Sequence, residues 1–206
     1  LSILFSSEEP ADIGFLYGVL SRANFKADTQ VLEDSSIIHT GDEIIVNAGY
    51  QKDTYFYVIF KNSEGEFDLL YADNKKIGKN QTDLPDTIYT PILPWSKFSA
   101  PTGDETFFLI NSKVYQENLI NLITRYDKVN DKGKKKLAKQ IQNEIDNLNP
   151  ESRQDLASIG SRLDKPVIGG VTFRGENDDE LKDLSLTNSC RGNSHIAFKK
   201  ILLNHK

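Results

Sequence analysis

Residues 41–71 read GDEIIVNAGYQKDTYFYVIFKNSEGEFDLLY, and this stretch decides the fold class. β-branched and aromatic residues, which favour strands, fill three short runs at 43–47, 55–60 and 67–71. The run 55–60 (YFYVIF) is apolar at successive positions, which indicates a strand that is covered on both faces. Asn62-Ser63-Glu64-Gly65 is typical of a hairpin turn before the third run. The stretch therefore predicts antiparallel β-structure, and it contains no residue set that performs chemistry.

The strand pattern continues to about residue 111 and then gives way to a helical one. We expect strands at 87–93, ended by Pro94, and at 105–111 (ETFFLIN), with a polar loop at 73–86 before them. Apolar residues at helical spacing follow between about 115 and 163, and the clearest stripe is Leu137, Ile141, Ile145 and Leu148. Asn149-Pro150 is typical of a further helix start.

The two ends of the chain also favour short elements. The stretch 10–20 (PADIGFLYGVL) fits a short helix with Pro10 in its first turn, although Gly14 and Gly18 weaken it, and a strand near 25–32 fits equally well. After Pro166 we expect a strand at 167–173, a polar loop at 174–194 and a closing strand at 196–203 (IAFKKILL).

These patterns together predict a mainly β protein of the α+β class, an antiparallel β-sandwich with an inserted helical subdomain. The closing strand is far in sequence from the other strands, so the helices form an insertion at about 115–163. We accordingly interpret residues 1–206 as a single domain. Tyr57, Ile59, Phe107 and Leu109 are its expected core residues.

Composition limits the function classes. The net charge of −5 argues against a nucleic-acid or anionic-membrane role. No apolar run approaches the roughly 20 residues that a membrane-spanning helix needs. Cys190 is the single cysteine, which excludes an internal disulfide. The chain has no methionine, so we expect it to be a processed or excised fragment, with room for a lipid anchor upstream of Leu1.

Residues 35–113 resemble a bacterial domain-of-unknown-function family, numbered four-three-eight-four. The resemblance is carried by Gly41-Asp42 before a strand, the aromatic strand 55–59, Gly65, Leu69-Leu70-Tyr71, the turn 101–105 (PTGDE), the apolar strand 107–112 and the terminal strand IAFKKILLNHK. The family usually has Pro-Asn after the Leu-Leu-aromatic strand, where this chain has Ala72-Asp73-Asn74. The resemblance implies a β-sandwich module of envelope lipoproteins, or one attached to peptidases and kinases. No enzymatic residue is carried over, because none is established for the module.

Few residues suggest catalysis or metal binding. Cys190 and His195 could form a thiol and base, but a spacing of five in an Asn-, Ser- and Gly-rich loop has no motif meaning, and we expect that loop to be wet. The other histidines, His39 and His205, make no zinc motif, and we expect His205, beside the C-terminus, to be solvated. We therefore predict no metal and no cofactor.

Two charged clusters are most simply read as solvated surface. The first is acidic and polar and surrounds the hairpin turn: Asn62, Glu64, Glu66 and Asp68. It does not fit an EF-hand calcium loop, because that register would place Phe60 and Tyr71 at positions that require carboxylates. A looser cation site that includes Asp73 or Asp86 remains an alternative. A basic cluster at a helix start comprises Lys128, Lys132, Lys134, Lys135, Lys136 and Lys139.

Three aromatic residues are the candidate binding residues. Trp95 follows Pro94 in an expected loop, where it is either a recognition anchor or a buried plug. With Tyr50 and Tyr55 it could bind a small ligand or a carbohydrate.

Three hypotheses about function follow. The first is a non-enzymatic module of the bacterial cell envelope (periplasm or outer-membrane lipoprotein) that acts by protein–protein interaction. The second is a small-ligand or carbohydrate-binding module. The third is a hydrolase whose site is assembled from distant residues such as Cys190, His195 and Asp179.

Overall fold

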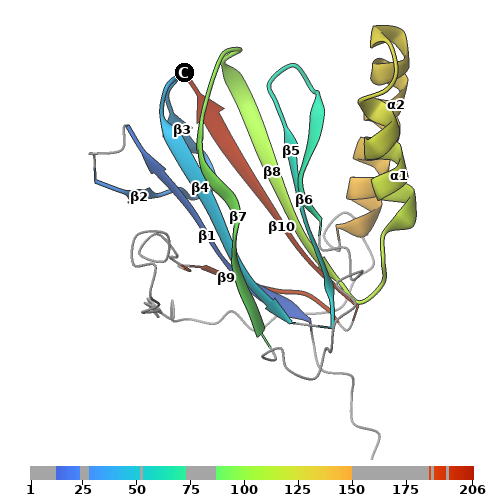
Figure 1. Cartoon of the computed structure of the whole chain (residues 1–206), viewed down its shortest axis with the longest axis horizontal. Helices are drawn as coiled ribbons and strands as arrows, with labels where there is room; N and C mark the ends of the chain where they lie inside the picture. The colour runs from blue at the N-terminus through green and yellow to red at the C-terminus, as the bar shows by residue number, and fades with distance from the viewer. Residues whose placement is uncertain are drawn as a thin grey trace, which may run out of the picture.

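The computed structural model of the chain describes residues 13–23, 28–51, 53–72, 87–149, 186, 188–193 and 195–206. The elements of these residues are, in order, β1 (Gly14–Arg22), β2 (Gln30–Val31), β3 (Ser36–Ile38), β4 (Glu43–Gln51), β5 (Tyr55–Lys61), β6 (Phe67–Ala72), β7 (Thr87–Lys97), β8 (Gly103–Ser112), α1 (Glu117–Tyr126), α2 (Asp131–Leu148), β9 (Asn188–Arg191) and β10 (Ile196–His205). Figure 1 shows two sheets, with α1 and α2 standing against one of them. The expected fold class, a β-rich sandwich with helices of the α+β class, is confirmed.

The strands of the described residues form two sheets. The first has the order β2-β1-β4-β7, with β9 also paired to β1, and the second has the order β3-β10-β8-β5-β6. All of these pairs are antiparallel except β3 with β10. β10 pairs with β8 from Ile196 opposite Ser112 to His205 opposite Gly103. The expected pairing of 196–203 with the earlier strands is therefore confirmed.

The main core lies between the two sheets, where alternate residues of each strand face inward. In β5, Phe56 and Val58 belong to this core and pack with Val46 and Ala48 of β4 and Leu109 of β8. All five side chains are buried. The alternation of side chains along a strand sends the residues between them to the opposite face.

A second core lies on the outer face of the β5–β8 sheet, against the helices. Tyr57 and Ile59 of β5 pack there with Ile123 of α1 and with Ile141 and Ile145 of α2. The two-sided apolar pattern of β5 and β8 is thus explained, because one face meets the other sheet and the other meets the helices. The expected stripe of Leu137, Ile141, Ile145 and Leu148 faces this core: the first three residues are buried and Leu148 is partly buried against it. Asn130 caps α2, and its side chain accepts a hydrogen bond from the Gly133 amide.

The prediction of a helix at 10–20 is wrong for residues 14–20, because Gly14–Arg22 form the strand β1. Phe15, Tyr17 and Val19 alternate into the core, and β1 pairs along its whole length except Gly14 with β4. A short apolar run fits either period, and the long partner strand decides between them. Of the alternative strand near 25–32, the structure shows Gln30–Val31 as β2.

Pro94 was expected to end a strand, and this is wrong because β7 continues to Lys97. β7 is the last strand of its sheet, so a residue without an N–H can face the unpaired edge. The register between β4 and β7 also shifts near Val46, which accommodates the irregularity.

The prediction of a polar loop at 174–194 is wrong near the end of that range, because Asn188–Arg191 form β9. This strand pairs with Gly14–Tyr17 of β1. The expected loop at 73–86, the helix after Pro150 and the strand at 167–173 lie outside the described residues.

Candidate functional site

An open cavity lies between β6 and β7, the edge strands of the two sheets, and we call it the edge cavity. Its volume is about 380 Å³, which is within the range of small-molecule sites. Side chains of both sheets and of the segment 98–101 line it. The apolar ones include Phe60, Leu70, Leu93, Phe98 and Phe107, and the charged ones are Asp68, Lys97 and Glu105.

Edge strands explain why a hollow forms here. β6 and β7 each pair on one side only among the described strands. The inward-facing apolar side chains at these two edges are therefore not covered by a further strand. Three phenylalanines line the gap: the ring of Phe60 lies 4.9 Å from that of Phe107 and 6.1 Å from that of Phe98, centroid to centroid. The gap is therefore walled by aromatic rings.

Glu105 is the unusual residue of this cavity. It continues the inward row of Phe107 and Leu109 on β8, and it is only 3% exposed. Its Oε1 lies 2.9 Å from Nδ1 of His205, whereas Oε2 is buried with no hydrogen-bond partner among the described residues. Burial raises the pKa of Glu105, and the hydrogen bond and charge of His205 lower it in part. A buried oxygen without a donor costs about 1–3 kcal/mol, more when it is charged.

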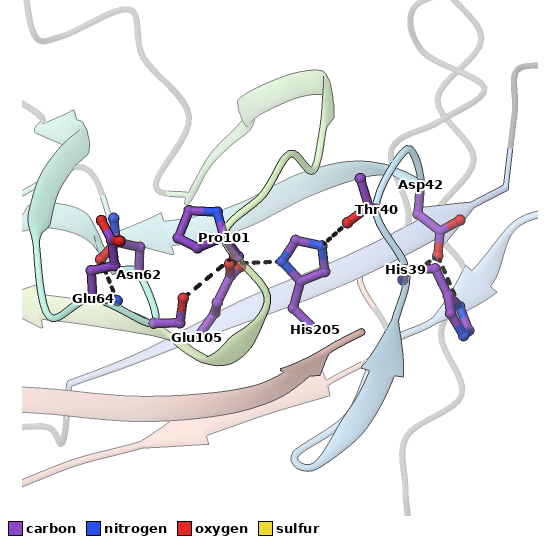
Figure 2. Close-up of polar contacts among 9 residues, drawn as sticks. His39, Thr40, Asp42, Asn62, Glu64, Pro101, Glu105 and His205 are labelled. Carbon is purple, nitrogen blue, oxygen red and sulfur yellow. Dashed lines mark hydrogen bonds and ion pairs between the residues drawn. The ribbon is translucent and has the colours of Figure 1, made fainter.

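His205 was expected to be solvated, and this is wrong because its side chain is fully buried. It continues the inward row of Ile201 and Leu203 on β10, whose period of two extends to within one residue of the C-terminus. Its Nε2 lies 2.9 Å from the hydroxyl oxygen of Thr40 (Figure 2). When Nδ1 carries the proton that it donates to Oε1 of Glu105, Nε2 can accept a hydrogen bond from the Thr40 hydroxyl.

The series Thr40–His205–Glu105 has the order of groups found in hydrolase triads: hydroxyl, imidazole and carboxylate. A triad also needs free N–H groups to stabilise the oxyanion. The amides beside the Thr40 hydroxyl are occupied, since Thr40 N–H donates to Lys206 O and Gly41 N–H donates to Phe98 O. The arrangement instead ties the turn after β3 and the end of β10 to the start of β8.

The three aromatic candidates do not form one site. Tyr50 is buried between the sheets, where its ring stacks on Phe56 and its hydroxyl hydrogen-bonds to that of Tyr71 at 2.6 Å. Tyr50 pairs with Ile88 near the start of β7, whereas Trp95 lies near the end of that strand.

Trp95 is part of β7 rather than of a loop, and it is half-buried under a cation. The guanidinium carbon of Arg22 lies 3.9 Å from the centre of its ring, and Arg22 in turn bonds Glu43 at 2.8 Å. Tyr55 is half-buried in the other sheet, with its ring 5.5 Å from that of Tyr115.

The thiol candidate is placed in a strand, not in a wet loop as expected. Cys190 is half-buried in β9, packs against the main core and donates to Phe198 O at 3.4 Å. His195 is exposed beyond the turn that follows β9. Asp179, the third member of that hypothesis, lies outside the described residues.

The charged clusters have local partners. The Asn62 side chain accepts from the amides of Glu64 and Glu66 and so shapes the hairpin turn. Glu66 lies 3.8 Å from Lys134 of the basic cluster. Among the described residues no group of His, Cys, Asp and Glu could hold a metal ion, and Asp73 and Asp86 are outside them.

A second hollow of about 420 Å³ lies along α1 and α2. Its lining is mostly amide and charged side chains: Asn118, Asn121, Leu122, Arg125, Gln140, Asn143 and Glu144. None of these residues has a buried polar atom without a partner. The edge cavity, which has one in Glu105, is therefore the stronger candidate site.

This site was not predicted from the sequence, although the sequence contains two signals for it. Glu105 is in phase with Phe107 and Leu109, and His205 is in phase with Ile201 and Leu203. A charged or polar residue in phase with a buried row indicates a buried polar group.

None of the helices in the described residues is long and apolar enough to cross a membrane. Comparisons with protein-family models, curated proteins and solved structures found no match to the chain.

Proposed function

We propose that this chain is a non-enzymatic accessory module of the bacterial cell envelope, which acts by protein–protein contact and receives a partner side chain in the edge cavity. The observation that carries the proposal is Glu105, a buried carboxylate that lines an open cavity and has one oxygen without a donor. Binding sites typically combine apolar walls with a few polar groups of this kind. The assignment to an envelope module rests on the resemblance of residues 35–113 to the family described above.

Two features support binding rather than catalysis. The amides that could stabilise an oxyanion beside Thr40 are held by Lys206 O and Phe98 O. The Cys190 thiol is half-buried in a strand and donates to a backbone carbonyl. A nucleophile needs a positioned base and an oxyanion site, and neither residue has both.

Small-ligand binding is the second candidate, and the volume of the edge cavity favours it, because about 380 Å³ also suits a metabolite. A protein partner is the first choice because the cavity is open to the surface between two edge strands, where a neighbouring chain can approach.

The test is selection of peptides from a random phage-displayed library on three immobilised proteins. They are the wild type, Ser99→Trp, which fills the mouth of the edge cavity, and Ser189→Trp, a matched control on β9, which pairs with β1 on the side of the β7 sheet away from β7. We expect peptides that bind the wild type and Ser189→Trp but not Ser99→Trp, and whose masses are unchanged after incubation. Peptides that bind all three proteins equally, or that are cleaved, would contradict the proposal. If no peptide is selected and a small metabolite binds saturably, the second candidate, small-ligand binding, would be established instead.

A further inference from the structure

Three charged side chains line the edge cavity, and two of them are acidic. Asp68 and Lys97 are exposed near its mouth, and Glu105 is buried in its wall. Lys97 forms no ion pair with either carboxylate, all three being residues that the structure describes. The lining therefore carries an excess of negative charge when both carboxyls are ionised.

The buried carboxylate lacks a donor on one of its two oxygens. His205 supplies a hydrogen bond to Oε1, while Oε2 has no partner among the described residues. His205 cannot serve both oxygens, because its other nitrogen is bonded to Thr40. An ionised carboxylate that is out of water requires donors on both oxygens, and a cationic donor satisfies it best.

The aromatic wall of the cavity favours the same kind of ligand. Phe60, Phe98 and Phe107 line it together with Glu105. The face of a phenyl ring carries partial negative charge and attracts an ammonium or guanidinium group, most strongly where water is excluded. Aromatic rings beside a carboxylate are the combination that recognises organic cations. An anion would meet two carboxylates, and a purely apolar group would leave Oε2 without a donor.

We propose that the edge cavity binds the ammonium group of a lysine side chain from a protein partner, with Glu105 Oε2 as its acceptor and the phenylalanine rings around its methylene chain. This inference rests on the proposed function and names the chemistry that the partner presents. Lysine suits the site because its long apolar stem can lie along the rings while its head reaches the buried carboxylate. A free alkylamine carries the same chemistry, so the experiment separates the two sources.

The experiment is titration of the isotope-labelled chain, followed by the amide resonances of residues 96–100 and 102–107 in two-dimensional NMR spectra. The probes are the blocked peptide acetyl-Gly-Lys-Gly-amide, its norleucine counterpart, which has no ammonium group, and n-butylammonium. We expect saturable shifts with the lysine peptide, binding weaker by about tenfold or more with the norleucine peptide, and weaker binding of n-butylammonium than of the lysine peptide. Equal binding of the lysine and norleucine peptides would overturn the inference, and so would tighter binding of the free amine than of the peptide.

Variants of the charged lining test the acceptor. Glu105→Gln should weaken the lysine peptide about tenfold, whereas Glu64→Gln, a control on the exposed hairpin turn outside the cavity, should leave its affinity unchanged. Lys97→Gln replaces an exposed residue, so this variant should stay folded. It therefore tests the inference even if Glu105→Gln unfolds the chain. It should strengthen the lysine peptide, because a like charge is removed. Weaker binding by Lys97→Gln would indicate an anion site and overturn the inference.

The two proposals fail in different ways. The lysine site would be refuted by selected peptides that bind only when the cavity is open, contain no lysine and bind Glu105→Gln as tightly as the wild type. That result would leave the proposed binding module unaffected. Failure of every peptide and every amine to bind would refute both.

Discussion

Ile141→Ala should destabilise the chain more than most single changes, because it removes the centre of the helix–sheet core. Ile141 is 0% exposed and lies in the middle of α2, within the cluster that joins the helices to Tyr57 and Ile59 of β5. The replacement keeps the helix, since alanine has the highest helix propensity. The loss is therefore one of packing.

The magnitude follows from the atoms removed. Alanine lacks three carbon atoms of the isoleucine side chain, and each buried methylene or methyl group contributes about 0.8 kcal/mol, so the transfer term is about 2.4 kcal/mol. The cavity left behind adds to this, because two helices and a sheet hold its walls apart. We expect a total loss of about 3–4 kcal/mol in the free energy of unfolding.

The assay is urea unfolding of both proteins, followed by far-ultraviolet circular dichroism. Lys139→Ala is the matched control, because Lys139 is exposed two residues away on the same helix and should change the free energy by less than about 0.5 kcal/mol. For a chain of this length the melting temperature of Ile141→Ala should fall by roughly 6–16 °C. A loss below about 1 kcal/mol, with an unchanged denaturant slope, would mean that α2 is not held against the sheet and would refute the second core.

Four further substitutions test other parts of the structure. Burial raises the pKa of Glu105 above its usual 4.5, so the unfolded chain loses this proton first, and wild-type stability should fall as the pH rises from about 4.5 through the raised pKa. Glu105→Gln should reduce that fall. The measurement is the urea midpoint of both proteins across this pH range, and midpoints that fall equally in both would contradict a raised pKa for Glu105. Burial, followed by the charge of Cys190, raises the pKa of Tyr17 to about 12, so Tyr17→Phe should remove a step near pH 12 from the tyrosinate absorbance titration. Gly41→Ala should cost about 1–2 kcal/mol for its positive φ of 97°. Gly103→Ala should cost measurably more, because its φ is 139° and its new Cβ would lie 2.7 Å from Cβ of Ser63; equal urea midpoints for the two variants would refute this.

Much of the fold was predictable because secondary structure is encoded in neighbouring residues. The run 55–60 has apolar residues on both faces of a strand, and Leu137, Ile141 and Ile145 recur at helical spacing. These periods indicated β5 and α2 and their burial without any knowledge of their partners. Gly14–Arg22 has no such clear period, and β1 forms there because β4 pairs with it.

The candidate site depended on contacts that no local pattern contains. Glu105 and His205 are 100 positions apart, and they meet because β10 pairs with β8 in one particular register after the helices between them. A shift of β10 by one residue against β8 would turn His205 to the opposite face of the sheet from Glu105. By itself, the sequence determined the fold class, most of the elements and the apolar rows, since these follow from spacing along the chain. Only the tertiary structure decided that a glutamate and a C-terminal histidine share a buried contact beside an open cavity, because strand register and edge position arise from packing between distant segments.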